Sequence, residues 1–292
     1  MDFDRVIEEK DRIIIKNVRN FKLYDVFECG QCFRWNKEEN GNYIGVAFSK
    51  VIEVEKKDDD VIIYNSSEED FINIWADYFD LYRDYNQIKQ ILKKDPILDK
   101  AVGYGEGIRL LSQEPFEILI SFIISSNNRI PMIKKVIENI SMKYGKQLEY
   151  KGKVYYGFPS VLELNLAKEE DLRGCSAGFR AKYIRKTLDD ILCGSCDLLE
   201  IKSMDFEDCG LNLQKLSGVG PKVADCIMLF SMNKYYSFPV DVWVKRAMDY
   251  FYKSGDVSLK KTREFAIYKF GELAGFAQQY LFFYARETKL NI

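Results

Sequence analysis

The sequence predicts an α+β fold, in which a small N-terminal antiparallel β-sheet domain precedes a larger all-helical domain. Short β-branched and aromatic runs separated by polar turns fill the chain up to about residue 64. Beyond that point apolar residues recur at helical spacing almost to the C-terminus. A chain of 292 residues is also long enough to bury two sizeable cores. We place the boundary so that the domains comprise residues 1–105 and 106–292.

Hairpins are expected to build the sheet, because turn residues at 39–42 and 56–60 separate the apolar runs. Each run is short and rich in valine, isoleucine and aromatic residues, which favour strands. The expected strands are 13–15, 33–35, 43–48, 51–54 and 61–64.

The first helix of the predicted series begins at a capping box. Ser67 is followed three residues later by Asp70, and apolar residues then recur at helical spacing up to Phe79. Further helices are predicted at 85–93, 116–124, 132–144, 161–166, 181–192, 208–216, 222–230, 242–252, 259–270 and 275–288.

Charge and hydropathy limit the possible partners. Lysine and arginine total 43 against 45 acidic residues, so a site for a polyanion must be local rather than a property of the whole surface. The longest apolar stretch, 116–124, is interrupted by Glu117 and Ser121 and is shorter than the roughly 20 residues of a membrane span. The first residues show no secretory signal pattern. We therefore expect a cytoplasmic protein that has no membrane partner.

Cysteine and histidine content restricts the chemistry. Seven cysteines without a signal peptide indicate reduced thiols. The pairs Cys29/Cys32 and Cys193/Cys196 lie too far apart in sequence for a zinc ribbon, and we interpret both as chance pairs. Histidine is absent, which excludes an imidazole base and most zinc chemistry. An acid, base or nucleophile must therefore be Asp, Glu, Lys, Cys, Ser, Thr or Tyr.

The segment between residues 213 and 226 carries the strongest functional signal. Gly218 and Gly220 flank Val219 and permit a sharp turn between two helices. Outward-facing amides of such a turn, together with the start of the second helix, can bind a phosphate without net positive charge. Taken alone, the two glycines favour a plain helical hairpin that needs them only for tight packing.

Lys222 adds a chemical function to this turn. It falls in the first turn of the second predicted helix, where the positive end of the helix dipole opposes an ammonium group. A neutral lysine amine is a nucleophile and can form a Schiff base. Asp241 precedes a further helical run, where it can cap the helix and can also stabilise positive charge on a sugar.

Several motifs resemble the helix-hairpin-helix glycosylase superfamily and, more narrowly, its 8-oxoguanine DNA glycosylases. The hairpin, its lysine and an aspartate about twenty residues later form the superfamily pattern. Matches in family order extend from about residue 20 to residue 286. The matching segments are Leu216-Ser-Gly-Val-Gly-Pro-Lys222, Pro239-Val-Asp241, Val219-Gly-Pro-Lys-Val-Ala-Asp-Cys226, Gly30-Gln-Cys-Phe-Arg-Trp35, Ser125-Ser-Asn127-Asn128, Gly178-Phe-Arg-Ala-Lys-Tyr183 and Ala274-Gly-Phe-Ala-Gln278.

The resemblance implies a bifunctional DNA glycosylase and AP lyase acting on double-stranded DNA that contains 8-oxoguanine. Lys222 matches the nucleophile that attacks C1′ of the flipped nucleotide, and Asp241 matches the carboxylate that assists it. β-Elimination at the abasic site would follow. We expect a monomer that works in the cytoplasm and associates with the nucleoid when it is on DNA.

The resemblance also implies a pocket for the extruded base. Cys226 and Phe282 match the residues that lie against its two faces. Gln278 matches the group that reads the Watson–Crick edge. Gly30 matches the carbonyl that accepts the N7 proton present in 8-oxoguanine and absent from guanine.

A further set of residues matches those that fill the space left by the flipped base and contact the orphaned cytosine. These are Asn127, Phe179 and Arg180. Without the resemblance, the favoured interpretations would be a helix cap, a core residue and a solvated charge, respectively. Met132 stands where the family commonly has a second arginine, and this departure predicts weaker selection of the opposite base.

No cofactor is expected to be required for the chemistry. The backbone carbonyls of Gln214, Leu216 and Val219 match those that hold a structural Na⁺ or K⁺ in the superfamily. Related iron–sulfur members carry four cysteines after the aspartate, whereas this chain has none after Cys226, so we expect neither an iron–sulfur cluster nor zinc.

Two alternative functions remain at this point. A non-catalytic helix-hairpin-helix DNA-binding protein would keep the hairpin but would not need Lys222 and Asp241 together. A glycosylase for alkylated bases would share the fold but would lack the recognition of 8-oxoguanine that Gly30 and Gln278 indicate.

Overall fold

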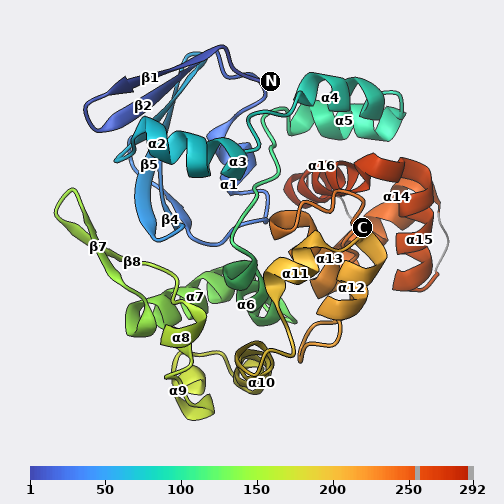
Figure 1. Cartoon of the computed structure of the whole chain (residues 1–292). Coiled ribbons are helices and arrows are strands. Elements are labelled where there is room, and N and C mark those ends of the chain that lie inside the picture. Colours follow the sequence, from blue (N-terminus) through green and yellow to red (C-terminus); the bar gives the residue numbers. More distant parts are fainter. Residues whose placement is uncertain (254–256, 289–292) are drawn as a thin grey trace.

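A computed structural model of the protein describes residues 1–253 and 257–288. A six-stranded antiparallel sheet occupies the N-terminal part and helices occupy most of the remainder (Figure 1). The predicted α+β class and its order along the chain are therefore confirmed.

The sheet has the strand order β1-β2-β6-β5-β4-β3, and every neighbouring pair is antiparallel. β1 was not predicted from the sequence, and β3 begins only at Trp35 rather than at residue 33. Gly45 is paired with Trp35, whose ring occupies the space that a Cβ at this position would need. The strands are β1 (Arg5–Glu9), β2 (Arg12–Lys16), β3 (Trp35–Lys37), β4 (Tyr43–Ala47), β5 (Lys50–Lys57) and β6 (Asp60–Tyr64).

Helices account for most of the chain after residue 67, and none of the described ones is long and apolar enough to cross a bilayer. Five of them escaped prediction: α1, α5, α9, α11 and the short η2. The helices are α1 (Leu23–Phe27), α2 (Glu68–Asp70), η1 (Phe71–Trp75), α3 (Ala76–Tyr78), α4 (Tyr85–Leu92), α5 (Pro96–Tyr104), α6 (Pro115–Ser125), α7 (Ile130–Tyr144), α8 (Val161–Leu164), α9 (Glu169–Gly174), α10 (Arg180–Leu192), α11 (Leu198–Ser203), α12 (Phe206–Leu213), α13 (Pro221–Ser231), α14 (Val242–Tyr252), α15 (Leu259–Phe270), η2 (Gly271–Leu273) and α16 (Ala274–Glu287).

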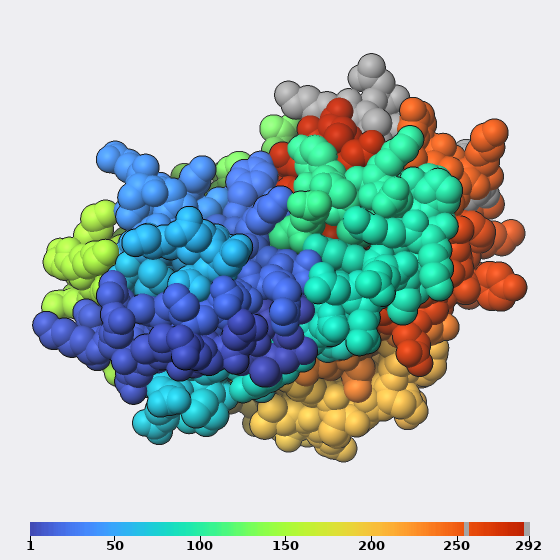
Figure 2. Space-filling model, turned by 90° about the horizontal axis from the view of Figure 1, so that it is seen from above, coloured from blue at the N-terminus to red at the C-terminus, as the bar shows by residue number. Residues whose placement is uncertain are grey.

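Two large apolar cores organise the molecule. One lies under the sheet and includes Trp35, Trp75 and Phe79, while the other lies among the helices. The apolar side chains of α4 and α5 belong to the helical core, and α5 packs on α16. Figure 2 shows these two helices between the N-terminal strands and the C-terminal helices. The domain boundary near residue 105 remains a prediction.

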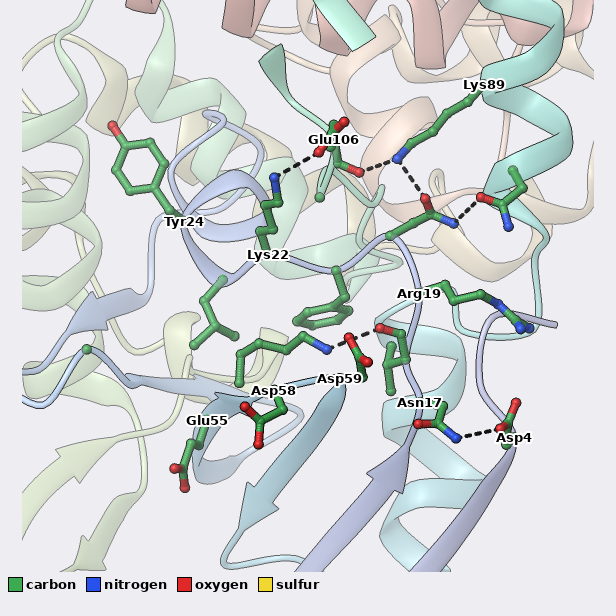
Figure 3. Close-up of a pocket in the computed structure, with 18 of the residues that line it drawn as sticks. Asp4, Asn17, Arg19, Lys22, Tyr24, Glu55, Asp58, Asp59, Lys89 and Glu106 are labelled. Atoms are coloured by element: carbon green, nitrogen blue, oxygen red, sulfur yellow. Dashed lines mark hydrogen bonds and ion pairs between the residues drawn. The ribbon is translucent and has the colours of Figure 1, made fainter. Parts of the chain in front are cut away.

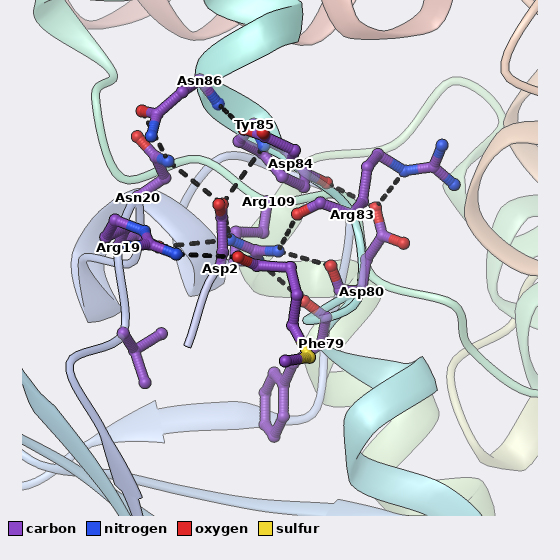
Figure 4. Close-up of polar contacts among 12 residues, drawn as sticks. Asp2, Arg19, Asn20, Phe79, Asp80, Arg83, Asp84, Tyr85, Asn86 and Arg109 are labelled. Carbon is purple, nitrogen blue, oxygen red and sulfur yellow. Dashed lines mark hydrogen bonds and ion pairs between the residues drawn. The ribbon is translucent and has the colours of Figure 1, made fainter. Parts of the chain in front are cut away.

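A buried polar network joins the two cores around Arg109 (Figure 4). Arg109 is fully buried, and its Nη1 lies 2.9 Å from Oδ2 of the buried Asp2. Its Nε donates to the Phe79 carbonyl at 2.9 Å, and its guanidinium lies 4.1 Å from the centroid of the Tyr85 ring. A buried charge requires such partners. The network therefore ties the N-terminus and the start of α4 to the segment that leads into α6.

A small hairpin, β7 (Gln147–Tyr150) and β8 (Lys153–Tyr156), interrupts the part of the chain that the sequence predicted to be all-helical. It extends from the helical part along the six-stranded sheet (Figure 1). The Tyr150 hydroxyl donates to Oε2 of Glu53 on β5 at 3.1 Å, and Lys151 pairs with the same carboxylate at 2.6 Å. The hairpin thus fastens the helical part to the outer face of the sheet.

Candidate active site

The predicted turn between two helices is formed by α12 and α13. Gly218 has a φ of +82°, and a Cβ at this position would lie 2.9 Å from atoms of Tyr183. Both the backbone angle and the close approach therefore require glycine. Gly220 is the N-cap of α13 and supplies no side-chain cap, so the first amides of the helix stay available to an anion.

Lys222 and Asp241 lie at the starts of the successive helices α13 and α14, and the charges of both act on Cys226. Lys222 is half-buried, and its Nζ lies 5.3 Å from the centroid of the Phe122 ring. Oδ1 of Asp241 accepts a hydrogen bond of 2.8 Å from the Val244 amide, as expected of an N-cap. Burial raises the pKa of the Cys226 thiol to about 11, with Lys222 lowering it and Asp241 raising it. The charges of Lys222 and Asp241 therefore both act on the same buried thiol.

A buried ion pair supports the helix that carries Lys222. Asp225 is almost completely buried on α13 and accepts two hydrogen bonds from Arg263 on α15, at 2.6 and 2.8 Å. Such a bidentate contact constrains both position and orientation. This pair was not predicted from the sequence, since no local pattern connects the two residues.

Gly30, Gln278 and Phe282 come together although they lie at opposite ends of the chain. Gln278 and Phe282 are one turn apart on α16, and therefore share a face of that helix. Gln278 is buried, and its Oε1 has no hydrogen-bond partner among the described residues. A Cβ built on Gly30, whose φ is +87°, would lie 3.0 Å from Cε1 of Phe282. Glycine thus permits close approach of the backbone to the aromatic ring.

The loop around Gly30 is held by the side chain of Gln31, which was not predicted to be a site residue. Nε2 of Gln31 donates to the carbonyls of Val26 at 2.9 Å and Arg109 at 2.7 Å, and its Oε1 accepts from the Leu111 amide. The available signal was the position of Gln31 directly after Gly30 in the motif Gly30-Gln-Cys-Phe-Arg-Trp35. Because Gln31 is fully buried, its hydrogen bonds stabilise this loop conformation.

The residues predicted to fill the space left by the flipped base also lie together. Asn127 is exposed with a φ of +50°, and Arg180 donates to its carbonyl at 2.8 Å. Arg180 also donates to the Ser126 carbonyl, and is buried rather than a solvated charge. Its guanidinium lies 4.5 Å from the centroid of the half-exposed Phe179 ring. Met132 is exposed in the first turn of α7.

The hairpin carbonyls are suited to a cation. No described residue donates a hydrogen bond to the carbonyl of Gln214 or Val219, whereas the Leu216 carbonyl accepts one from the Val219 amide at 3.2 Å. Unpaired carbonyl oxygens of this kind can coordinate a hard cation. Within the described residues, no group of three or more His, Cys, Asp or Glu side chains could hold a metal ion.

The cysteines are free thiols. Burial raises the pKa of Cys29 to about 12 and also raises that of Cys32 well above its usual value. A thiol with a raised pKa is a poor nucleophile. The pair therefore lacks the low-pKa thiol that disulfide exchange requires.

A large hollow of about 1420 Å³ lies away from Lys222, between the loops of the sheet and α4 (Figure 3). Its lining carries charges of both signs. Lys22 pairs with Glu106 at 3.0 Å, and Lys89 donates to Oδ1 of Asn20 at 2.7 Å. These groups already satisfy one another, and none of the predicted site residues lines this hollow.

Comparison with known proteins identifies the family. Residues 13–119 match the N-terminal domain of 8-oxoguanine DNA glycosylase, and residues 120–271 match the HhH-GPD superfamily of base excision DNA repair proteins. The chain belongs to the 8-oxoguanine DNA glycosylase family. The resemblance stated from the sequence motifs is thereby confirmed, and family membership favours a bifunctional N-glycosylase/DNA lyase over the two alternative functions.

Individual relatives agree with this assignment. The Clostridium acetobutylicum 8-oxoguanine glycosylase/lyase, in complex with double-stranded DNA containing cytosine opposite 8-oxoguanine, is 61% identical with a TM-score of 0.98, covering 99% of this chain and 100% of that one. A probable N-glycosylase/DNA lyase of Methanothermobacter thermautotrophicus is 36% identical over 73% of this chain and 74% of its own length. An Arabidopsis thaliana N-glycosylase/DNA lyase is 32% identical over 88% and 75%, respectively.

Proposed function

We propose that this 8-oxoguanine DNA glycosylase excises the damaged base from double-stranded DNA through attack of the Lys222 amine on C1′ of the extruded nucleotide. The observation that carries the proposal is the placement of Lys222 and Asp241 at the starts of two successive helices, α13 and α14, where both charges act on the buried thiol of Cys226. Breaking the glycosidic bond releases the base and leaves the sugar attached to the amine. Ring opening gives a Schiff base, from which β-elimination cleaves the strand.

Asp241 is proposed to stabilise the positive charge that develops on the sugar during base release. Its Oδ1 is used by the Val244 amide, while Oδ2 has no hydrogen-bond partner among the described residues. A fixed carboxylate near an oxocarbenium-like sugar lowers the energy of the transition state more than that of the bound substrate. The helix cap therefore holds the carboxylate in place without using both of its oxygens.

Recognition of the base is proposed to use the slot between Gly30 and α16. The Gly30 carbonyl accepts the N7 proton of 8-oxoguanine, and Gln278 uses its unpaired Oε1 at the Watson–Crick edge. Cys226 and Phe282 lie against the two faces. Guanine presents an N7 lone pair instead of a proton, so its binding would leave the carbonyl unpaired, at a cost of about 1–3 kcal/mol.

Duplex binding is proposed to use two further groups of residues. The amides of the turn at Gly218, Val219 and Gly220 bind phosphate, and a Na⁺ or K⁺ held by hairpin carbonyls would add positive charge there. The second group occupies the space left by the flipped base and contacts the orphaned cytosine, because extrusion otherwise leaves an unstacked gap. It consists of Asn127, Met132, Phe179 and Arg180.

Borohydride trapping on a duplex with one 8-oxoguanine tests this proposal. The natural protein should form a covalent adduct with the DNA, and Lys222→Gln should form none while still binding the duplex, since phosphate contacts come from the hairpin. Lys260→Gln is a matched control, because Lys260 is also the second residue of a helix, α15, and is highly exposed. An adduct that persists in Lys222→Gln would disprove the assignment of the nucleophile.

A further inference from the structure

Two side chains of α16 hold the segment that precedes Gly30. Nε2 of Gln279 donates to the Cys29 carbonyl at 2.6 Å, and Nη2 of Arg286 donates to the Glu28 carbonyl. The two donors are two helical turns apart and so lie on the same side of α16. The next carbonyl along the chain, that of Gly30, accepts no hydrogen bond from any described residue.

Arg286 also contacts Phe282, which lies on the other side of the proposed base slot. Its guanidinium carbon lies 5.5 Å from the centroid of the Phe282 ring. Its Nη1 lies 3.4 Å from the position that a Cβ on Gly30 would occupy. The side chain is held further by Glu287, whose Oε1 accepts from Nε at 3.0 Å. The guanidinium of Arg286 therefore contacts both the loop at Gly30 and the ring of Phe282.

The location of Arg286 favours a cation on electrostatic grounds. Glu28 is the C-cap of α1, and Arg286 lies in the last turn of α16, so the carbonyl ends of both helices meet at this point. The negative ends of two helix dipoles attract positive charge. A second link, from the Tyr24 hydroxyl to Oε2 of Glu287 at 2.9 Å, joins the same two helices.

We propose that Gln279 and Arg286 form a two-point clamp that sets the position of the Gly30 carbonyl relative to Phe282, and thus act as positioning residues for recognition of the oxidised base. This inference rests on the proposed role of Gly30. Glycine at a positive φ has wide conformational freedom, so its carbonyl direction depends on how the preceding peptide units are held. The clamp holds the carbonyls of Glu28 and Cys29 and leaves the Gly30 carbonyl free to bind the base.

The clamp should matter only when a base must be read. Strand cleavage at a preformed abasic site uses the amine and the carboxylate but no base slot. We therefore expect Arg286→Gln to slow single-turnover excision of 8-oxoguanine by about tenfold, because small displacements of a reading group are costly. Cleavage of an abasic duplex and its borohydride trapping should be unchanged, as should duplex affinity.

Three other variants complete the experiment. Arg286→Lys retains the charge and a donor for the Glu28 carbonyl, and should recover part of the excision rate. Gln279→Met should impair excision in the same selective way from the other end of the clamp. Arg185→Gln is the control, because Arg185 donates to the carbonyls of Asn165 and Ala167 far from the slot, with a side chain of similar exposure.

The outcomes separate this inference from the proposed function. Equal excision rates in the natural protein and Arg286→Gln would overturn the clamp, and so would an equal loss of both reactions accompanied by lower thermal stability. A natural protein that cleaves abasic DNA but ignores 8-oxoguanine would contradict the proposed base slot itself. Selective loss of excision in Arg286→Gln and Gln279→Met, without such a loss in Arg185→Gln, supports the clamp.

Discussion

The proposed chemical groups and the proposed base slot are built in different ways. Lys222 and Asp241 belong to one short segment and owe their places to the starts of two successive helices, α13 and α14. The slot instead joins a loop near residue 30 to the last helix, with the hydrogen bond from Gln279 to Cys29 spanning 250 residues. Local rules for the start of a helix thus suffice to place the proposed chemical groups, whereas the proposed base slot depends on long-range packing.

This difference predicts distinct consequences of substitution. Changes in the chemical segment should affect both excision and abasic-site cleavage, because both reactions are proposed to use the Lys222 amine. Changes in the slot should affect excision alone. The first two of the following variants each report on one of these regions, and each has a structural counterpart elsewhere in the chain, while the third concerns the orphaned base.

The largest effect is expected for Asp241→Asn. Asparagine caps a helix as well as aspartate does, so thermal stability should be retained. Removal of the negative charge should slow excision about 10²- to 10³-fold, since the carboxylate acts mainly when charge develops on the sugar. Single-turnover kinetics and thermal unfolding measure the two quantities.

Asp205→Asn is the matched control for this variant, because Asp205 caps α12 through the equivalent contact with the Asp208 amide, at 2.9 Å. It should leave excision unchanged. A normal excision rate in Asp241→Asn would show that Asp241 serves only as a helix cap and that its negative charge is not needed for the reaction.

An intermediate effect is expected for Gly30→Ala. Gly30 and Gly41 have nearly equal φ values, +87° and +89°, but only Gly30 has a neighbour within 4 Å of a built Cβ. Both alanine variants should therefore lose similar stability, about 1–3 kcal/mol for a strained backbone. Only Gly30→Ala should slow excision of 8-oxoguanine, by about tenfold, because its methyl group would press on Phe282.

Parallel assays on abasic duplexes sharpen this test. Gly30→Ala should cleave them at the natural rate if the slot and the chemical segment are separate. A proportional loss of both activities would show instead that the loop at residue 30 supports the whole site.

The smallest effect is expected for Met132→Arg. Met132 is 43% exposed at the start of α7, so an arginine there would not disturb a core and is expected to contact the orphaned base. Partly solvated contacts should add about 1 kcal/mol of preference for cytosine opposite the lesion, the low end for a base contact. Excision rates on four duplexes that differ only in the opposite base measure this preference.

A natural enzyme that already selects cytosine strongly, and does not change in Met132→Arg, would show that Asn127 and Arg180 suffice. That result would place opposite-base selection in the buried contacts of Arg180 rather than on the exposed face of α7.

Several elements with a strong local pattern were predicted, although α5, which begins with the capping Asp95 and Pro96, was missed. The helices that begin at Ser67 and Asp241 have a capping residue followed by apolar residues at helical spacing. By contrast, the β7–β8 hairpin consists of four-residue strands, and it forms where apolar residues of the sheet, Ile44 and Val51, need cover. A short strand has little preference of its own and depends on such packing.

The same division holds within the site. The sequence alone determined the turn at Gly218 and the cap at Asp241, because glycine and aspartate have local backbone preferences. It also determined the place of Lys222, which directly follows that turn. Which carbonyls Gln279 and Arg286 would reach was decided only by the tertiary structure. The physical reason is that a side-chain hydrogen bond to a distant backbone leaves no periodic trace along the chain, and forms only once packing has brought α1 and α16 together.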